Sequence, residues 1–106
     1  MKLVLSNIGP DDADRVARAL IDERRAACVN LTPVRSVYRW EGSVHVDPEV
    51  TMLIKVSLDG LDALVARLRE LHPYDLPEIV VLDVDVERSL GAYVQWVRDE
   101  TGRAEL

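Results

Sequence analysis

Between residues 26 and 56 the chain reads AACVNLTPVRSVYRWEGSVHVDPEVTMLIKV, two long runs rich in β-branched and aromatic residues on either side of Glu41-Gly42. Such runs predict two strands joined by a tight turn. We expect Pro33 at an edge or bulge and a break at Asp47-Pro48, because proline has no N–H for a ladder. At about 3.3 Å per residue, an unbroken strand over residues 26–40 would reach about 50 Å. The hairpin should therefore project from its own domain toward a neighbour.

The flanking segments complete an alternating pattern of strands and helices. Residues 3–8 are a short apolar run that predicts a buried strand, and residues 11–21 repeat apolar side chains at helical spacing. Residues 61–71 predict a second amphipathic helix, and residues 78–86 a last strand, followed by Ser89 as the expected cap of a closing helix. The order βαββαβ with a terminal helix predicts an α+β, ferredoxin-like fold with an antiparallel sheet.

Length and charge limit the class of protein. The 106 residues suit one domain spanning 1–106, large enough for a core without disulfides. With 13 basic and 19 acidic residues, the chain has no general attraction for nucleic acid or anionic membranes. A single cysteine favours a reducing compartment, and the first apolar run is too short for a signal peptide. We therefore expect a cytoplasmic protein with no nucleic-acid or membrane partner.

The first and last of the expected strands carry apolar residues on both alternating sets. These are Leu3 and Leu5 with Val4, and Ile79 and Val81 with Val80 and Leu82. Two helices can cover only one face of such a sheet, so the second apolar face requires another cover. A second copy of the chain would supply it, and we expect an oligomer.

The segment from His72 to Ile79, HPYDLPEI, concentrates polar groups at the junction of a helix and a strand. It presents an imidazole, a phenol and two carboxylates around two prolines, which hold the neighbouring residues in extended geometry. Two interpretations remain open: a rigid binding site, or a stiff connector whose residues serve the turn alone.

Five ordered blocks carry a family resemblance. They are RRAACVN at 24–30, SVYRWEG at 36–42, EVTMLIK at 49–55, HPYDLPE at 72–78 and YVQW at 93–96. Together they cover nearly the whole chain and resemble the CutA-type divalent-cation tolerance family. The resemblance implies a ferredoxin-like subunit in a tight homotrimer, similar in architecture to the PII-type regulatory proteins. It also implies an association with tolerance to copper and other divalent ions.

The same resemblance implies a ligand cleft between subunits. Its residues would be Tyr38, Trp40, Lys55, His72, Tyr74, Glu78 and Trp96. An ammonium inside an apolar strand, as at Lys55, must pair with a carboxylate or face a cleft. A lysine, a glutamate and a histidine beside aromatic rings would suit a small anionic or amphipathic ligand.

The ligands for a metal ion are few. Some family members carry a cysteine at the end of the first strand and a doubled histidine before Pro-Tyr, whereas this chain has Ser6 and Leu71 there. His72 is the candidate ligand for a divalent cation such as copper, and no cofactor is required. His45 is interpreted as a solvated strand residue, and Cys28 as a small apolar residue of the core.

These observations favour a trimeric divalent-cation (copper) tolerance protein that binds an ion or a small ligand in a regulatory, non-enzymatic role. The alternative is an enzyme acting on a small molecule in the cleft, with His72 and Glu78 as acid and base. A nucleotide sensor is a weaker variant, because the sequence shows no glycine-rich phosphate cradle.

Overall fold

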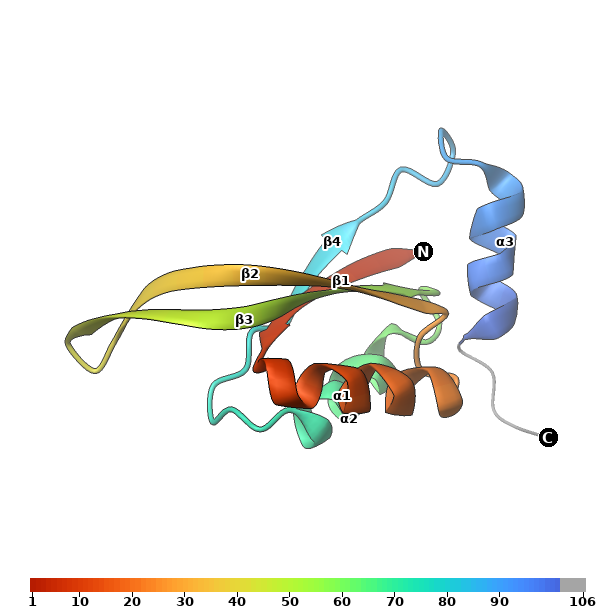
Figure 1. The fold of residues 1–106 in the computed structure, drawn as a ribbon. Coiled ribbons are helices and arrows are strands. Elements are labelled where there is room, and N and C mark those ends of the chain that lie inside the picture. Colours follow the sequence, from red (N-terminus) through yellow and green to blue (C-terminus); the bar gives the residue numbers. More distant parts are fainter. Residues whose placement is uncertain (102–106) are drawn as a thin grey trace.

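The structure is a computed structural model that describes residues 1–101. The elements, in chain order, are β1 (Lys2–Ile8), α1 (Pro10–Asp22), β2 (Cys28–Trp40), β3 (Ser43–Val56), α2 (Leu61–Leu71), β4 (Val80–Asp83) and α3 (Gly91–Glu100). The strands form an antiparallel sheet in the order β2-β3-β1-β4, and α1 and α2 lie together against one face (Figure 1). The predicted α+β order of elements is confirmed.

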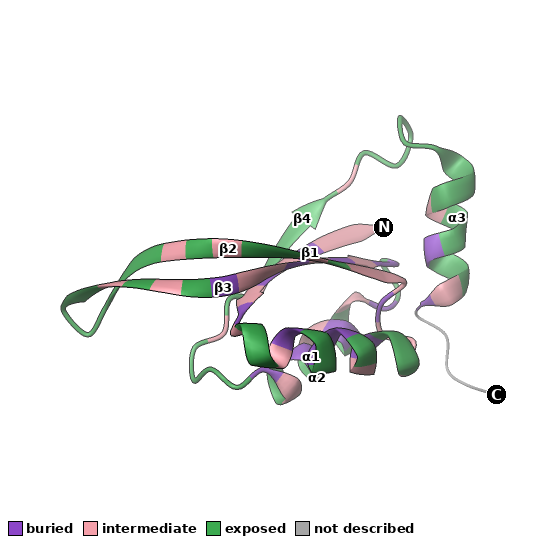
Figure 2. Cartoon of the chain, in the orientation of Figure 1, coloured by how far each residue is buried: buried purple, intermediate pink, exposed green. Residues whose placement is uncertain are grey.

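The hydrophobic core fills the space between the sheet and the two helices. Met52, Ile54 and Val56 alternate along β3 and are fully buried, as the period of two predicts for one face of a strand. Leu64 and Leu68 meet them from α2. Figure 2 shows buried residues where the sheet meets α1 and α2, and mostly exposed residues along the outer part of the hairpin.

The hairpin turn is short and strongly shaped. Trp40 pairs with Ser43, which leaves only Glu41 and Gly42 in the loop. Their φ angles are 49° and 80°, and positive φ at both positions is the mark of a type I′ turn. This turn matches the twist of the strands, so the two strands stay paired up to the tip.

Of the two prolines of the hairpin, one lies as predicted and the other does not. Pro33 lies on the edge strand β2 in unbroken register with Val50, so the edge position is confirmed and no bulge is present there. The predicted break at Asp47-Pro48 is wrong, because β3 runs continuously from Ser43 to Val56. Since β1 pairs with β3 only from Val50 onward, Pro48 has a neighbouring strand on one side alone and its missing N–H disrupts no ladder.

The last strand is shorter than residues 78–86. It spans Val80–Asp83, because Asp83 pairs with Lys2 near the start of β1 and no partner strand continues beyond. At its other end Pro77 cannot donate to a ladder. The segment before Val80 is therefore free to leave the sheet.

Ser89 does not cap the closing helix. Leu90 occupies the N-cap position of α3, whereas the Ser89 hydroxyl donates to the Asp85 carbonyl at 2.6 Å. The serine thus closes the preceding turn, an alternative use of a short polar side chain that competes with capping.

The end of α1 is fixed by its own backbone and by a hydrogen bond to α3. Arg24 adopts φ 56°, and the N–H groups of Arg24 and Arg25 donate back to Ile21 and Leu20, the pattern of a Schellman motif. The Arg24 guanidinium donates to the Asp99 carbonyl at 2.8 Å. A cation at this place suits the C-terminal end of α3 and ties that helix to α1.

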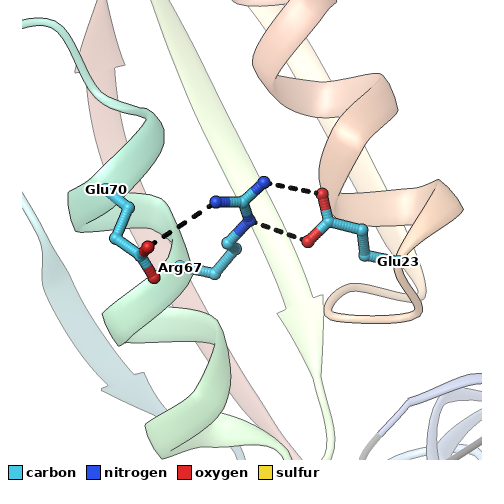
Figure 3. Close-up of polar contacts among 3 residues, drawn as sticks. All are labelled: Glu23, Arg67 and Glu70. Atoms are coloured by element: carbon cyan, nitrogen blue, oxygen red, sulfur yellow. Dashed lines mark hydrogen bonds and ion pairs between the residues drawn. The ribbon is translucent and has the colours of Figure 1, made fainter.

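A second arginine joins the two helices of the core layer (Figure 3). Arg67 on α2 donates twice to the Glu23 carboxylate, at 2.7 and 3.0 Å, and lies 3.7 Å from Glu70. The two parallel bonds fix the geometry better than a single contact would. The hydrogen bond from Arg67 also lowers the pKa of Glu23.

We predict that Glu23→Gln destabilises the protein at neutral pH but not in acid. A lowered pKa means that the carboxylate stabilises the fold above its ordinary value of 4.5 and loses this effect as the pH falls through the lowered pKa. Urea unfolding at several pH values, with Asp14→Asn on the exposed side of α1 as a control, measures the difference. A difference that does not change with pH would contradict the assignment.

We predict that Ser6→Ala stabilises the protein by about 1 kcal/mol, because a buried hydroxyl without a partner is unfavourable by about that amount or more. The Ser6 hydroxyl is fully buried and has no hydrogen-bond partner among residues 1–101. Ser57→Ala is the matched control, since the Ser57 hydroxyl is buried but accepts a bond from the Gly60 N–H at 3.1 Å. Equal losses of unfolding free energy in both variants would refute the expectation.

Candidate functional site

The segment between α2 and β4, residues 72–79, is here called the connector. It leaves the helix sharply and runs beside the sheet. His72 ends α2 with extended backbone angles, as the following proline requires. The chain then passes the half of β1 that does not pair with β4. There the Asn7 side chain links β3 to the connector. The Asn7 amide accepts a hydrogen bond from Thr51 at 2.6 Å and donates to Glu78 at 3.3 Å.

The outer part of the hairpin, residues 34–49, is here called the hairpin arm. Its strands have no neighbour except each other, because the pairing of β1 stops at Val50. Tyr74 of the connector reaches the arm, where its hydroxyl donates to the Glu49 carboxylate at 2.7 Å. The connector is therefore fixed against the arm by a side-chain bond between segments far apart in sequence.

A cavity of about 710 Å³ lies between the hairpin arm and the connector. This volume is in the range of small-molecule sites. It is lined by Asn7, Ser36, Val37, Tyr38, Trp40, Glu49, Pro73, Tyr74, Asp75, Leu76 and Glu78. Below, this space is called the arm cavity.

Two phenol–carboxylate pairs lie along this site. Besides Tyr74 and Glu49, the Tyr38 hydroxyl donates to Asp47 at 2.6 Å. Burial, and then the bond to Glu49, raise the pKa of Tyr74; the bond to Asp47 raises the pKa of Tyr38. A raised pKa favours the protonated phenol, which is the form that donates in both of these bonds.

His72 holds the connector in place through both nitrogens of its ring. It is only 6% exposed, and its Nε2 lies 2.9 Å from the Asn7 carbonyl while Nδ1 accepts the Tyr74 N–H at 3.2 Å. Because a carbonyl cannot donate, Nε2 carries the proton in this arrangement. The imidazole also packs edge-on against the Tyr74 ring, with the ring centroids 4.7 Å apart.

Lys55 and Trp96 lie elsewhere. The Lys55 ammonium is 3.9 Å from the Cys28 sulfur and 5.7 Å from the centre of the Tyr93 ring, which packs on Trp96. We call these four residues the α3 cluster. Figure 1 shows α3 at the end of the molecule opposite the hairpin tip.

The structure thus divides the predicted cleft residues within one subunit. Tyr38, Trp40, Tyr74 and Glu78 line the arm cavity; His72 stands behind it; Lys55 and Trp96 belong to the α3 cluster. Along β3, the position of Lys55 is four residues from that of Thr51 beside Asn7, about 13 Å at strand spacing. The grouping of all seven residues at one site stays a prediction.

Two other sequence interpretations need adjustment. Cys28 is half-buried beside Lys55 and does not belong to the core cluster. His45 is half-buried on the hairpin arm, where its ring stacks on Tyr38 with centroids 5.4 Å apart.

The site contains residues that the sequence did not single out. Asn7, Asp47 and Glu49 all take part, and Glu49 is 9% exposed. The sequence did contain a sign of this site. Polar and apolar residues alternate along β3, so that Asp47, Glu49 and Thr51 share the face opposite Met52. Only the tertiary contact with Tyr74 shows that this polar face is used.

The described residues do not form a metal centre. Among residues 1–101, no three histidine, cysteine or acidic side chains are placed to hold a metal ion together. His72 as a ligand for a divalent cation stays a prediction, and in this structure both its ring nitrogens already have partners.

Comparisons with known proteins agree on one family. The model of the CutA1 divalent ion tolerance protein family matches residues 3–100. The Divalent-cation tolerance protein CutA of Thermus thermophilus is 39% identical over 95% of this chain and 98% of its own length. The human Protein CutA is 42% identical over 84% of this chain, which spans 49% of that longer protein.

A solved structure gives the same result. The PII-like protein CutA from Nostoc in apo form has a TM-score of 0.94 and 48% identity, covering 95% of this chain and 97% of its own.

The names of two relatives give two different cellular compartments. The rice Protein CutA 1, chloroplastic, is 39% identical over 82% of this chain, which covers 49% of it. A protein from Archaeoglobus fulgidus whose name includes periplasmic is 27% identical with a TM-score of 0.86, covering 97% of this chain and 100% of its own. Among residues 1–101, no helix is long and apolar enough to cross a membrane.

The family match extends over nearly the whole chain, and the structural match covers both the sheet and its helices. The sequence resemblance is thereby confirmed, and the chain belongs to the CutA1 divalent ion tolerance protein family, with a PII-like fold.

Proposed function

We propose that the protein is a non-enzymatic, ligand-binding regulatory member of this family, that it works as a homotrimer, and that the arm cavity is its binding site. The observation that carries the proposal is the cavity itself, in which aromatic rings and carboxylates from two distant segments converge. The Tyr74–Glu49 bond holds these segments in place before any ligand arrives, and a preformed site loses less free energy on binding.

The geometry gives less support to an enzyme with His72 and Glu78 as acid and base. To act as a general base, His72 would need a ring nitrogen that is free to reach the proton it removes. Both nitrogens of His72 are engaged by the backbone at Asn7 and Tyr74, and the ring does not line the cavity. A role in positioning the connector accounts for the histidine without catalysis.

The proposed homotrimer follows from the hairpin arm. A two-stranded ribbon is marginally stable in water by itself. Val37, Val44 and Val46 on this arm are 65%, 60% and 58% exposed, and β2 is an unpaired edge. Packing against another copy would bury these valines and cover the edge.

The face of the sheet opposite α1 and α2 supports the same proposal. Leu3 and Leu5 of β1 share that face with Val80 and Leu82 of β4, and each of the four is at least partly exposed. An apolar sheet face of this kind normally packs against another layer. Neighbouring copies around a common axis would provide that layer.

We predict that Val46→Asp lowers the mass in solution from three chains to one without disrupting the core, because the valine is exposed in the subunit and does not belong to the core cluster. Sedimentation equilibrium at low micromolar concentration measures the mass. Ala63→Asp on the exposed side of α2 is the matched control and should remain trimeric. A monomeric parent protein with cooperative unfolding would refute the assembly.

A divalent ion such as copper belongs to the proposal only as a weakly held ligand. The acidic side chains at the cavity do not converge as a closed ligand set among the described residues, and tight sites usually use three or four protein ligands. No resident cofactor is proposed. The cytoplasm remains the proposed compartment on the basis of the single cysteine, and no nucleic-acid or membrane partner is proposed for a chain of net charge −6.

We predict that Cu²⁺ binds with a dissociation constant above about 1 μM, weaker than a closed soft-ligand site would give. Isothermal titration with CuCl₂ measures the constant for the parent chain, His72→Ala and Glu78→Gln. Any heat of binding should decrease when His72 or Glu78 is changed and persist in Asp62→Asn on the exposed side of α2. A submicromolar site that survives the loss of His72 would contradict the ligand assignment.

A further inference from the structure

We draw no further inference here: the strongest candidate, the half-buried Cys28 thiol beside the Lys55 ammonium in the α3 cluster, is a lone cysteine on the sheet face that neighbouring copies would cover, and no other feature of residues 1–101 marks a ligand there.

Discussion

The length of the central hairpin is the constraint on which the rest of the structure depends. Its strands have 13 and 14 residues, whereas β1 has only seven and pairs with β3 from Val50 to Val56. The helices α1 and α2 pack against the half of the hairpin that lies beside β1. The other half extends as an arm with hydrogen bonds to itself alone, so its valines and its edge need a partner that the subunit does not contain.

The short last strand has an equally specific consequence. Because β4 covers only residues 2–5 of β1, the connector before it is left beside Asn7 and can turn toward the arm. There Tyr74 donates to Glu49, and the space between connector and arm becomes a cavity. A longer β4 would have placed Glu78 in a ladder opposite Asn7 and removed part of the cavity wall. The site exists because two neighbouring strands of the sheet differ in length.

The chemistry of the site differs from what its residue types first suggest. His72, the residue most readily assigned to metal binding or catalysis, is nearly buried and bonded to backbone at both nitrogens. The groups that line the cavity include phenols, an indole and carboxylates. Among residues 1–101, the acidic side chains at the cavity do not have the converging geometry that a tightly held metal ion needs.

Local pattern was sufficient to predict the order of elements, the turn at Glu41-Gly42 and the motif blocks of the family, because hydrophobic period and turn residues act over a few positions. It failed at Pro48, at the ends of β4 and at Ser89, where the outcome depends on which strand or turn lies alongside. The cavity likewise depends on residues 7, 49 and 74, which no sequence spacing relates. Lys55 and Glu78 seemed to belong together from the resemblance, yet the register of β1 and β3 separates their surroundings in one subunit. Sequence decides which side chains alternate on a strand; only the pairing of strands of unequal length decides which of them meet.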